Sequence, residues 1–299
     1  MTDNDRSGRS YRVGEHGFTA LPPEPGLYLV ATPIGHLGDI TLRALEIVAG
    51  ADRLACEDTR VTAKLLARYG IERRTVSYHE HNAAEAGAAL IADLEAGLSV
   101  ALVSDAGTPL VSDPGARLAQ AAIDRGIPVW PIPGASAVLS ALIASGLPAE
   151  SFFFAGFPPP KQMARRGRLE ELVRVPGTLV FYEAPHRIAE SLADMAEIYG
   201  AERPAAVCRE LTKAHETTYR GPLGDLARDF AAMERVRGEI AVVIAPPPAE
   251  APATAEDVDT ILAGLLDEMK PAKAAQEAAR LTGLPRRDLY ARALAMKKR

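Results

Sequence analysis

The sequence predicts an α/β protein of two domains followed by a small helical module. Three observations support this. The chain has 299 residues, more than most single hydrophobic cores contain. Its first 146 residues or so alternate short apolar strands with helical patterns, which is typical of a mainly parallel sheet. A proline-rich stretch over 247–254 then reads as a linker to three further helical patterns.

Composition and charge narrow the class of protein. Hydrophobic residues make up 47% and charged residues 24%, as in ordinary globular proteins. No apolar run approaches the roughly 20 residues that span a bilayer, so we expect no membrane contact. The polar segment 1–24 lacks the apolar core of a secretory signal, and we expect it to be a disordered tail of a cytoplasmic protein. The net charge of −5 means that any nucleic-acid binding needs a local basic patch.

The two cysteines point to core positions. Cys56 and Cys208 are far apart in the sequence, and each lies in an apolar, strand-like run. Two such residues argue against a disulfide scaffold and against a cysteine zinc site. His79 and His81 lack metal-ligand spacing, so no metal site is predicted.

The first domain is expected over 25–147. Its predicted strands cover 26–31, 53–56, 75–78, 99–103 and 128–132, and the helical patterns between and after them cover 42–50, 62–68, 83–95, 116–125 and 138–146. Thr41 and Asn82 are good N-cap residues for two of these helices. Glycines such as Gly50 and Gly97 end them.

The second domain is expected over 148–246, with a mixed sheet. The aromatic run 152–157 opens it, and its predicted strands cover 178–182, 205–209, 216–220 and 239–245. The second and third of these strands are close enough in sequence to form an antiparallel pair. Helical patterns run to about Arg174, to Tyr199 and from Gly221 onward.

The last segment, 255–299, carries helical patterns over 257–268, 271–281 and 285–296. Three short helices with a glycine turn resemble a helix-turn-helix module. A small helical cap with a solvated face explains the pattern equally well.

Four loops of the first domain carry its unusual residues: 32–35, 57–60, 104–115 and 133–137. All follow predicted parallel strands, so they should emerge at one edge of the sheet, where open α/β sheets bind ligands. The longest, 104–115, combines small residues with prolines and carboxylates. No phosphate loop, dinucleotide fingerprint or nucleophile elbow is present, which argues against the commonest ligands and against serine-hydrolase chemistry.

These loops carry a family resemblance. Together, Leu29–Gly35, Glu57–Arg60, Ser104–Gly115 and Pro131–Ala137 resemble the tetrapyrrole-methylase superfamily of S-adenosylmethionine-dependent methyltransferases. Phe181–Arg187, Arg209–Lys213 and the following His215-Glu216 resemble the branch that 2′-O-methylates a cytidine ribose in small-subunit (16S) ribosomal RNA. The match runs from about Gly26 to Ala245, and the three-helix tail fits that branch. His36 departs from it, since asparagine is commoner there.

The resemblance implies a two-domain fold with the cofactor, S-adenosylmethionine, in the cleft between domains, and a homodimer. It implies free small-subunit RNA or the assembled small subunit as substrate. The residues it assigns to the cofactor are Pro33, Gly107, Thr108, Pro109, Ser136, Ala137, Tyr182, Leu211 and Ala241. For Tyr182 and Leu211, plain core packing is an equally good reading.

Methyl transfer to a ribose hydroxyl requires positioning and assistance in losing the hydroxyl proton. The candidates are Asp58, Glu183 and Lys213, with Glu57 as a further carboxylate. Each can also be read as a structural ion-pair partner, and for Glu57 the alternative is a pair with Arg60 on the first helical turn.

Basic side chains predict where RNA binds, through phosphate contacts. The predicted RNA-binding residues are Arg60, Lys161, Arg165, Arg166, Arg187, Arg286 and Arg287. Two other functions stay open from the sequence: methylation of a small tetrapyrrole-like or other non-RNA acceptor, and non-catalytic RNA binding. The tail and the basic cluster at 161–168 favour RNA, because a small acceptor needs neither.

Overall fold

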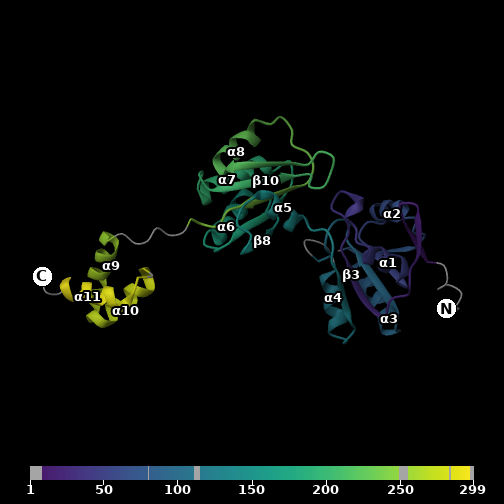
Figure 1. Cartoon of the computed structure of the whole chain (residues 1–299), viewed down its shortest axis with the longest axis horizontal. Coiled ribbons are helices and arrows are strands. Elements are labelled where there is room, and N and C mark those ends of the chain that lie inside the picture. The colour runs from purple at the N-terminus through teal and green to yellow at the C-terminus, as the bar shows by residue number, and fades with distance from the viewer. Residues whose placement is uncertain (1–8, 80, 111–114, 249–254, 283, 297–299) are drawn as a thin grey trace. The chain divides into compact units, whose positions relative to one another are not determined.

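The computed structural model describes residues 9–79, 81–110, 115–248, 255–282 and 284–296. The chain divides into two compact units, Met1–Pro246 and Pro247–Arg299. Figure 1 shows the elements of each unit. The first unit contains two five-stranded sheets, one in residues 26–132 (the first half) and one in residues 152–244 (the second half).

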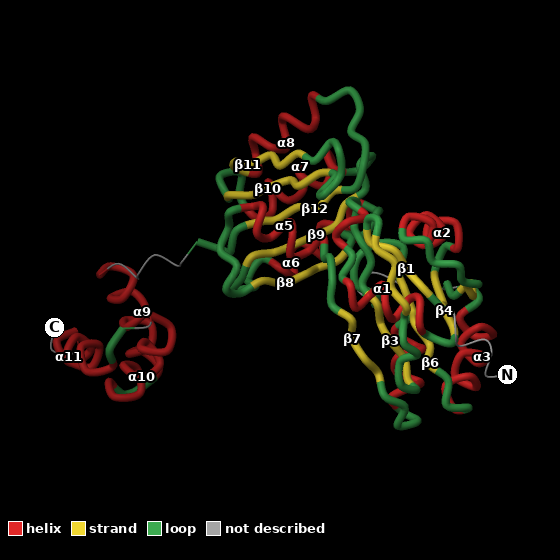
Figure 2. Tube along the Cα trace, turned by 45° about the vertical axis from the view of Figure 1, so that its right-hand side comes forward, coloured by secondary structure: helices red, strands yellow, loops and turns green. Residues whose placement is uncertain are grey.

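The sheet of the first half is parallel throughout, as the alternating pattern predicts. Its strands are β3 (Gly26–Val30), β4 (Arg53–Cys56), β5 (Thr75–Ser77), β6 (Ser99–Val103) and β7 (Val129–Ile132). They lie in the order β5-β4-β6-β3-β7. Figure 2 labels β4, β6, β3 and β7 of this sheet. The carboxyl ends of all five strands therefore meet at one edge.

Helices cover both faces of this sheet, because its strands are apolar on both sides. The helices are α1 (Leu42–Gly50), α2 (Thr59–Arg68), α3 (Ala83–Glu95) and α4 (Ala116–Ile123). One core joins α1 and α2 to alternate strand residues such as Val30 and Leu54. The other joins α3 and α4 to the intervening residues, such as Leu27 and Ala55.

The sheet of the second half is mixed. Its strands are β8 (Phe152–Gly156), β9 (Thr178–Glu183), β10 (Pro204–Arg209), β11 (Thr217–Pro222) and β12 (Ile240–Ile244), in the order β11-β10-β12-β9-β8. β10 and β11 form the predicted antiparallel pair, and β8 pairs with β9 in parallel.

The two faces of the second sheet have different coverings. The helices α6 (Gln162–Leu172), α7 (Ile188–Tyr199) and α8 (Leu223–Ala232) pack on one face, where Leu179 and Phe181 lie. The single helix α5 (Ala137–Ser145) packs on the other, together with Val180 and Tyr182. Successive residues of a strand point to opposite faces, so Tyr182 and Glu183 belong to different layers.

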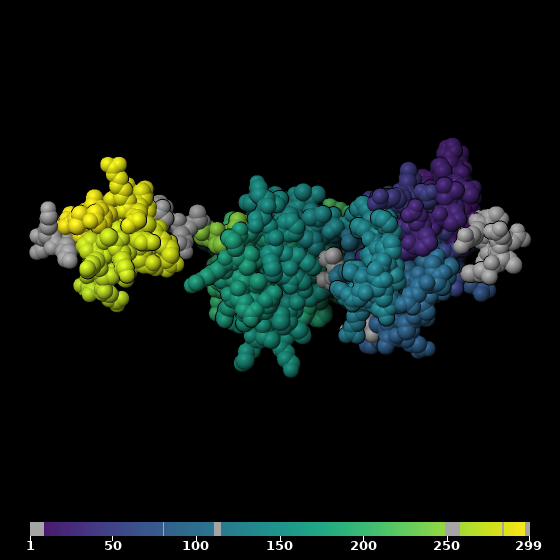
Figure 3. All heavy atoms as spheres, turned by 90° about the horizontal axis from the view of Figure 1, so that it is seen from below, coloured from purple at the N-terminus to yellow at the C-terminus, as the bar shows by residue number. Residues whose placement is uncertain are grey.

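The prediction of a disordered tail over 1–24 is wrong for its second part; residues 1–8 lie outside the described residues. A hairpin of β1 (Ser10–Val13) and β2 (His16–Thr19) packs on the first half. The Arg9 guanidinium donates hydrogen bonds to the Gly50 and Ala51 carbonyls at the end of α1. In the space-filling view, the dark purple hairpin forms part of the first half's surface (Figure 3). Two strands of four residues are too short to be predicted from their sequence pattern. An isolated hairpin of this size is only marginally stable, and the contacts with distant residues stabilise it.

The second unit is a three-helix core. Its helices are α9 (Ala255–Glu268), α10 (Pro271–Thr282) and α11 (Arg286–Met296). Val258, Leu262, Ala275 and Leu289 form its buried centre. In the part of the chain that the structure describes, no helix has the length and apolar character needed to cross a membrane.

Candidate functional site

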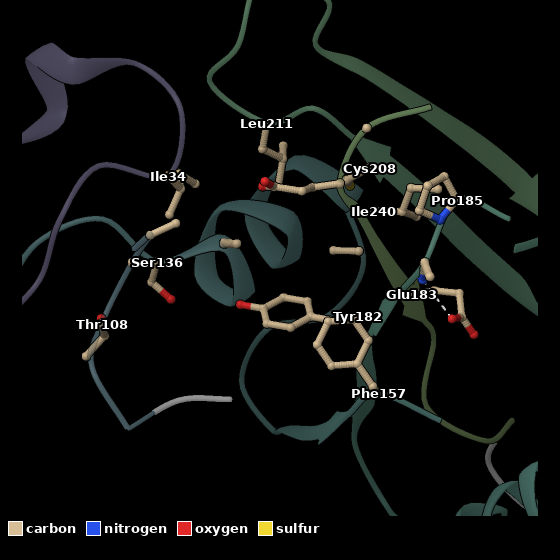
Figure 4. A pocket seen from close by; sticks show the side chains of 17 residues that line it. Ile34, Thr108, Ser136, Phe157, Tyr182, Glu183, Pro185, Cys208, Leu211 and Ile240 are labelled. Atoms are coloured by element: carbon tan, nitrogen blue, oxygen red, sulfur yellow. Dashed lines mark hydrogen bonds between the residues drawn. The ribbon is translucent and has the colours of Figure 1, made fainter. Parts of the chain in front are cut away.

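A cavity of about 430 Å³ opens in the first unit, between loops of the first half and strands of the second (Figure 4). The loops after β3 and β6 and the start of α5 line one side. Residues of β9, β10 and β12 and the loops next to them line the other. The volume falls in the usual range for a small-molecule site.

The first-half wall presents mainly backbone. Thr32 and Gly107 exchange two backbone hydrogen bonds, of 2.8 and 3.0 Å, which join the loop after β3 to the loop after β6. The Ser104 hydroxyl donates to the Gly107 carbonyl at 2.9 Å. Gly107 has a φ of +81°, which favours glycine, and it lines the cavity without a side chain. This loop is therefore rigid without bulky side chains.

The N-terminus of α5 also faces the cavity. Ser136 is its N-cap, and its hydroxyl accepts a hydrogen bond from the Leu139 amide at 3.5 Å. Ser136 and Ala137 both line the cavity. The unpaired amides at a helix start attract a carboxylate.

The second-half wall presents side chains instead. The Tyr182 ring points toward the loops that carry Thr108 and Ser136 (Figure 4). It packs edge-on against Phe154, with ring centroids 4.9 Å apart, and against Phe157 at 5.5 Å. Cys208 belongs to the same lining, and burial of its thiol raises the pKa of that group by desolvation. The result is an apolar wall on the strands.

The two halves touch directly at one side of the cavity. The His36 amide donates to the Thr212 hydroxyl at 3.0 Å. A Cβ on Gly35 would lie 2.5 Å from Lys213 Cγ and 2.7 Å from Thr212 Oγ1, so only glycine allows this approach. Thr212 itself has a φ of +63°, which is uncommon for a β-branched residue. We call the contact of 35–36 with 211–213 the clasp.

His36 has a local role in the clasp. Its Nδ1 accepts a hydrogen bond from the Gly38 amide at 3.2 Å and so caps the short helix η2 (Leu37–Asp39). An asparagine carbonyl could make the same type of bond. The departure at this position therefore leaves the loop's capping intact.

Glu183 is placed as a structural group. Its carboxylate is fully buried and accepts hydrogen bonds from the Ser191 hydroxyl and the Ala184 amide. The Arg187 guanidinium lies 2.7 Å from the same carboxylate. Glu183 contributes to the lining, but its carboxylate is engaged on the α7 side of the sheet. The structure disfavours the prediction that it acts as a base.

Asp58 lies outside the cavity lining. It is the N-cap of α2, which explains why that helix starts at Thr59, earlier than predicted. The Arg60 guanidinium donates hydrogen bonds to both carboxylate oxygens of Asp58, from Nη2 at 2.6 Å and from Nε at 3.0 Å. Arg60 therefore pairs with Asp58 and not with Glu57. These hydrogen bonds lower the pKa of Asp58 to about 2. A carboxylate with so low a pKa is a weak base.

Lys213 stands next to the cavity. Its ammonium group lies 2.9 Å from Glu210 and 3.1 Å from the lining residue Glu239. Burial opposes its charge, but these two carboxylates outweigh burial and raise the pKa of Lys213. It is therefore a fixed cation near the cavity and cannot act as a base at neutral pH.

The structure brings together most of the residues predicted for the cofactor. Those in the lining are Gly107, Thr108, Ser136, Ala137, Tyr182, Leu211 and Ala241. Pro33 and Pro109 are buried beside it without lining it. The end of the long loop, residues 111–114, lies outside the described residues.

The predicted basic patch at 161–168 is wrong for Arg165. Its side chain is 1% exposed and donates to Asp194 at 2.7 Å, so it cannot reach a phosphate. Arg166 is partly exposed and bridges Asp194 and Glu197. Lys161 is exposed. The acidic partners lie on α7, about 30 residues further along, and the local sequence gives no sign of them.

The other predicted RNA-binding residues differ in access. Arg60 is 88% exposed although it pairs with Asp58. Arg187 is mostly buried against Glu183. Arg286 and Arg287 are exposed in the first turn of α11.

Sequence reasoning missed several lining residues, among them Cys208 and Phe157. Cys208 lies opposite Ala241 in the β10–β12 ladder, so the antiparallel pairing could have found it. Phe157 follows directly after β8, which ends at Gly156. Among the described residues, no group of three or more His, Cys, Asp or Glu side chains is placed to hold a metal ion.

Comparison with known proteins identifies the family. Residues 26–227 match the model of the tetrapyrrole (corrin/porphyrin) methylases. The chain belongs to the tetrapyrrole methylase family. Residues 252–297 match the RsmI C-terminal HTH domain, which favours the helix-turn-helix reading of the tail over the helical cap.

Relatives within the family share most of the chain. A protein of Mesorhizobium japonicum named ribosomal RNA small subunit methyltransferase I is 58% identical over 95% of this chain and 97% of its own. A protein of the same name from Xylella fastidiosa is 47% identical over 89% of this chain and 98% of its own.

A solved methylase shares the fold. The uroporphyrin-III C-methyltransferase of Thermus thermophilus in complex with S-adenyl homocysteine superposes with a TM-score of 0.51 and 21% identity. The match covers 73% of this chain and 96% of that one. The expected α/β methylase fold is thus confirmed.

Proposed function

We propose that this chain transfers the methyl group of S-adenosylmethionine to the ribose 2′-hydroxyl of a cytidine in small-subunit ribosomal RNA. The observation that carries the proposal is the 58% identity, over nearly the whole chain, to a ribosomal RNA small subunit methyltransferase I. A cavity of suitable size for the donor and the match of residues 252–297 to an HTH domain also support the proposal.

The cavity has the features that the donor requires. The absence of a side chain at Gly107 leaves room for the charged methionine end, and the amides at the start of α5 suit its carboxylate. Tyr182, Leu211 and Ala241 offer an apolar surface for the adenosine. The donor would supply an electrophilic methyl group, and the chain's task is to hold it in line with the acceptor oxygen.

Assistance to the hydroxyl is proposed for Lys213, and not for Asp58 or Glu183. Its fixed positive charge would stabilise the oxygen as the hydroxyl loses its proton. The test compares Lys213→Gln with Lys213→Arg: the first should lower kcat strongly with little change in KM, and the second should retain much of it. Equal kcat for both variants and the native enzyme would exclude this role.

The helical tail is proposed to bind the RNA. Arg286 and Arg287 lie in the first turn of α11, which is the second helix of the α10–α11 pair. Helix-turn-helix modules present the N-terminal end of their second helix to nucleic acid. Deleting the residues after Pro252 should weaken RNA binding and flatten its salt dependence, while affinity for S-adenosylhomocysteine stays unchanged. Unchanged RNA affinity would contradict this proposal.

The assembly is also a proposal. We infer a cytoplasmic homodimer whose protomer has α/β lobes over 25–147 and 148–246 and the tail over 255–299. The family resemblance supports the dimer, and light scattering across a concentration series tests it: a mass near twice 31.8 kDa is expected.

The decisive experiment for the function uses labelled S-adenosylmethionine and small ribosomal subunits from a strain that lacks this gene. We expect label at a single cytidine 2′-oxygen after nucleoside mapping. Free RNA in a parallel reaction identifies the true substrate. Absence of label in both, with methylation of a small acceptor, would reject RNA as the substrate.

A further inference from the structure

One large aromatic side chain at the cavity is not enclosed by the protein. Phe157 lines the cavity, yet 54% of its surface is exposed. Its ring lies beside Tyr182 (Figure 4), with centroids 5.5 Å apart and planes at 60°. It therefore contacts Tyr182 and presents much of its surface to the open side of the cavity.

The backbone fixes Phe157 in this position. The pairing of β8 with β9 shifts register between Phe154 and Gly156, and irregularities of this kind re-aim side chains next to active sites. Gly156 has a φ of +68°, and three prolines at 158–160 follow. Arg187 donates to the Pro158 carbonyl at 3.4 Å. The ring is thus held by its backbone and does not depend on burial.

A rigid, exposed aromatic surface suits the base of a nucleotide. A ribose hydroxyl can approach a methyl donor held in the cavity only if its nucleotide leaves the RNA stack, which loses stacking energy. Aromatic side chains restore that energy, because every base has a flat face. The exposed Lys161 four residues further on is of the right charge for a neighbouring phosphate.

We propose that Phe157 is the stacking surface for the base of the target nucleotide. This inference rests on the proposed RNA methylation and adds the residue that receives the acceptor. The competing occupant is the adenine of the donor. The exposure of Phe157 favours the acceptor base over the adenine of the donor. Side chains that enclose a small ligand are largely buried by the surrounding protein, as Leu211 and Ala241 are.

The first test is Phe157→Ala, with Phe153→Ala as matched control. Phe153 lies on β8, just before Phe157 in the chain, is 38% exposed and does not line the cavity. Loss of one stacked base should raise KM for the RNA by about tenfold. Affinity for S-adenosylhomocysteine and the Tm should match those of the control. Phe157→Trp should restore most of the RNA affinity, since it restores a flat surface.

The second test reads stacking directly. Once the methylated cytidine is mapped, a fluorescent pyrrolocytidine at that position should be quenched on binding the native enzyme. Phe157→Ala should lose the quenching, and Phe153→Ala should keep it.

The outcomes separate the two proposals. If the native enzyme methylates no RNA, the proposed function fails and this inference fails with it. If it does methylate RNA, and Phe157→Ala instead weakens S-adenosylhomocysteine binding, the residue belongs to the donor. An unchanged KM, or quenching that persists in Phe157→Ala, also overturns the stacking role.

Discussion

The two halves of the first unit build the same cavity by different means. The described residues bury four charged side chains, Arg165, Glu183, Asp194 and Arg203, and all of them lie in the second half. The polar side chains buried in residues 9–147 are neutral hydroxyls of threonine and serine. The first half lines the cavity mainly with loop residues that have small side chains, whereas the second half lines it with side chains on its strands. Buried ion pairs lie within the second half. The same substitution type should therefore act differently in the two halves.

The largest difference is expected for arginine removal. Arg165→Ala leaves the buried Asp194 short of a partner and should lower the free energy of unfolding by about 3–5 kcal/mol. Arg53→Ala breaks a pair with Asp93 whose side chains are 32% and 26% exposed, and should cost about 1 kcal/mol or less. Urea unfolding measures both. Equal losses would remove the contrast between the halves.

Truncation of cavity side chains should hurt the second half more. Tyr182→Ala removes an aromatic wall and should weaken S-adenosylhomocysteine binding by roughly ten- to a hundredfold, from about 1.5–3 kcal/mol of lost contact. Thr108→Ala loses only a 3.4 Å hydrogen bond to the Ala135 carbonyl and should change affinity little. Calorimetric titration decides between them, and a larger loss for Thr108 would reverse the comparison.

Addition of a methyl group should distinguish two positions within the first half, one at the cavity and one outside it. Gly107→Ala and Gly126→Ala both place a side chain at positive φ, +81° and +67°, so each should cost about 1–2 kcal/mol of stability. Gly126 has open space around it and lies far from the lining. Only Gly107→Ala should also weaken S-adenosylhomocysteine binding. If both variants bind equally well, the backbone of this loop is not a ligand surface.

A small effect of pH is expected from the exposed pair of Asp58 and Arg60. Because the folded pKa of Asp58 is lowered to about 2, its contribution to stability is present above about pH 4 and disappears as the pH falls toward 2. Asp58→Asn should therefore lose less stability than the native protein between pH 4.5 and 2.5. Urea unfolding midpoints of both proteins at the two pH values test this. An equal change in midpoint for the native protein and Asp58→Asn would contradict it.

Local signals in the sequence predicted the first half well and the second half only in part. Strands, turns and caps such as Thr41 depend on neighbouring residues, so the parallel sheet and its loops could be derived. The burial of Arg165 depends on α7, and the clasp joins Gly35 to residues more than 170 positions away. The alternation of side chains along a strand predicts that Tyr182 and Glu183 face opposite sides of the sheet. Because Phe181–Arg187 was interpreted as one motif, this difference was not used.

The thiol of Cys208 is a potential nucleophile in the lining of the cavity. A cavity that receives an alkylating sulfonium compound must not offer it a competing nucleophile, and the reactive form of cysteine is the thiolate. Desolvation raises the pKa of this thiol, so at neutral pH it stays protonated and inert. With the donor bound in this cavity as proposed, the enzyme would be protected from methylating itself, and mass spectrometry after long incubation with the donor should find Cys208 unmodified.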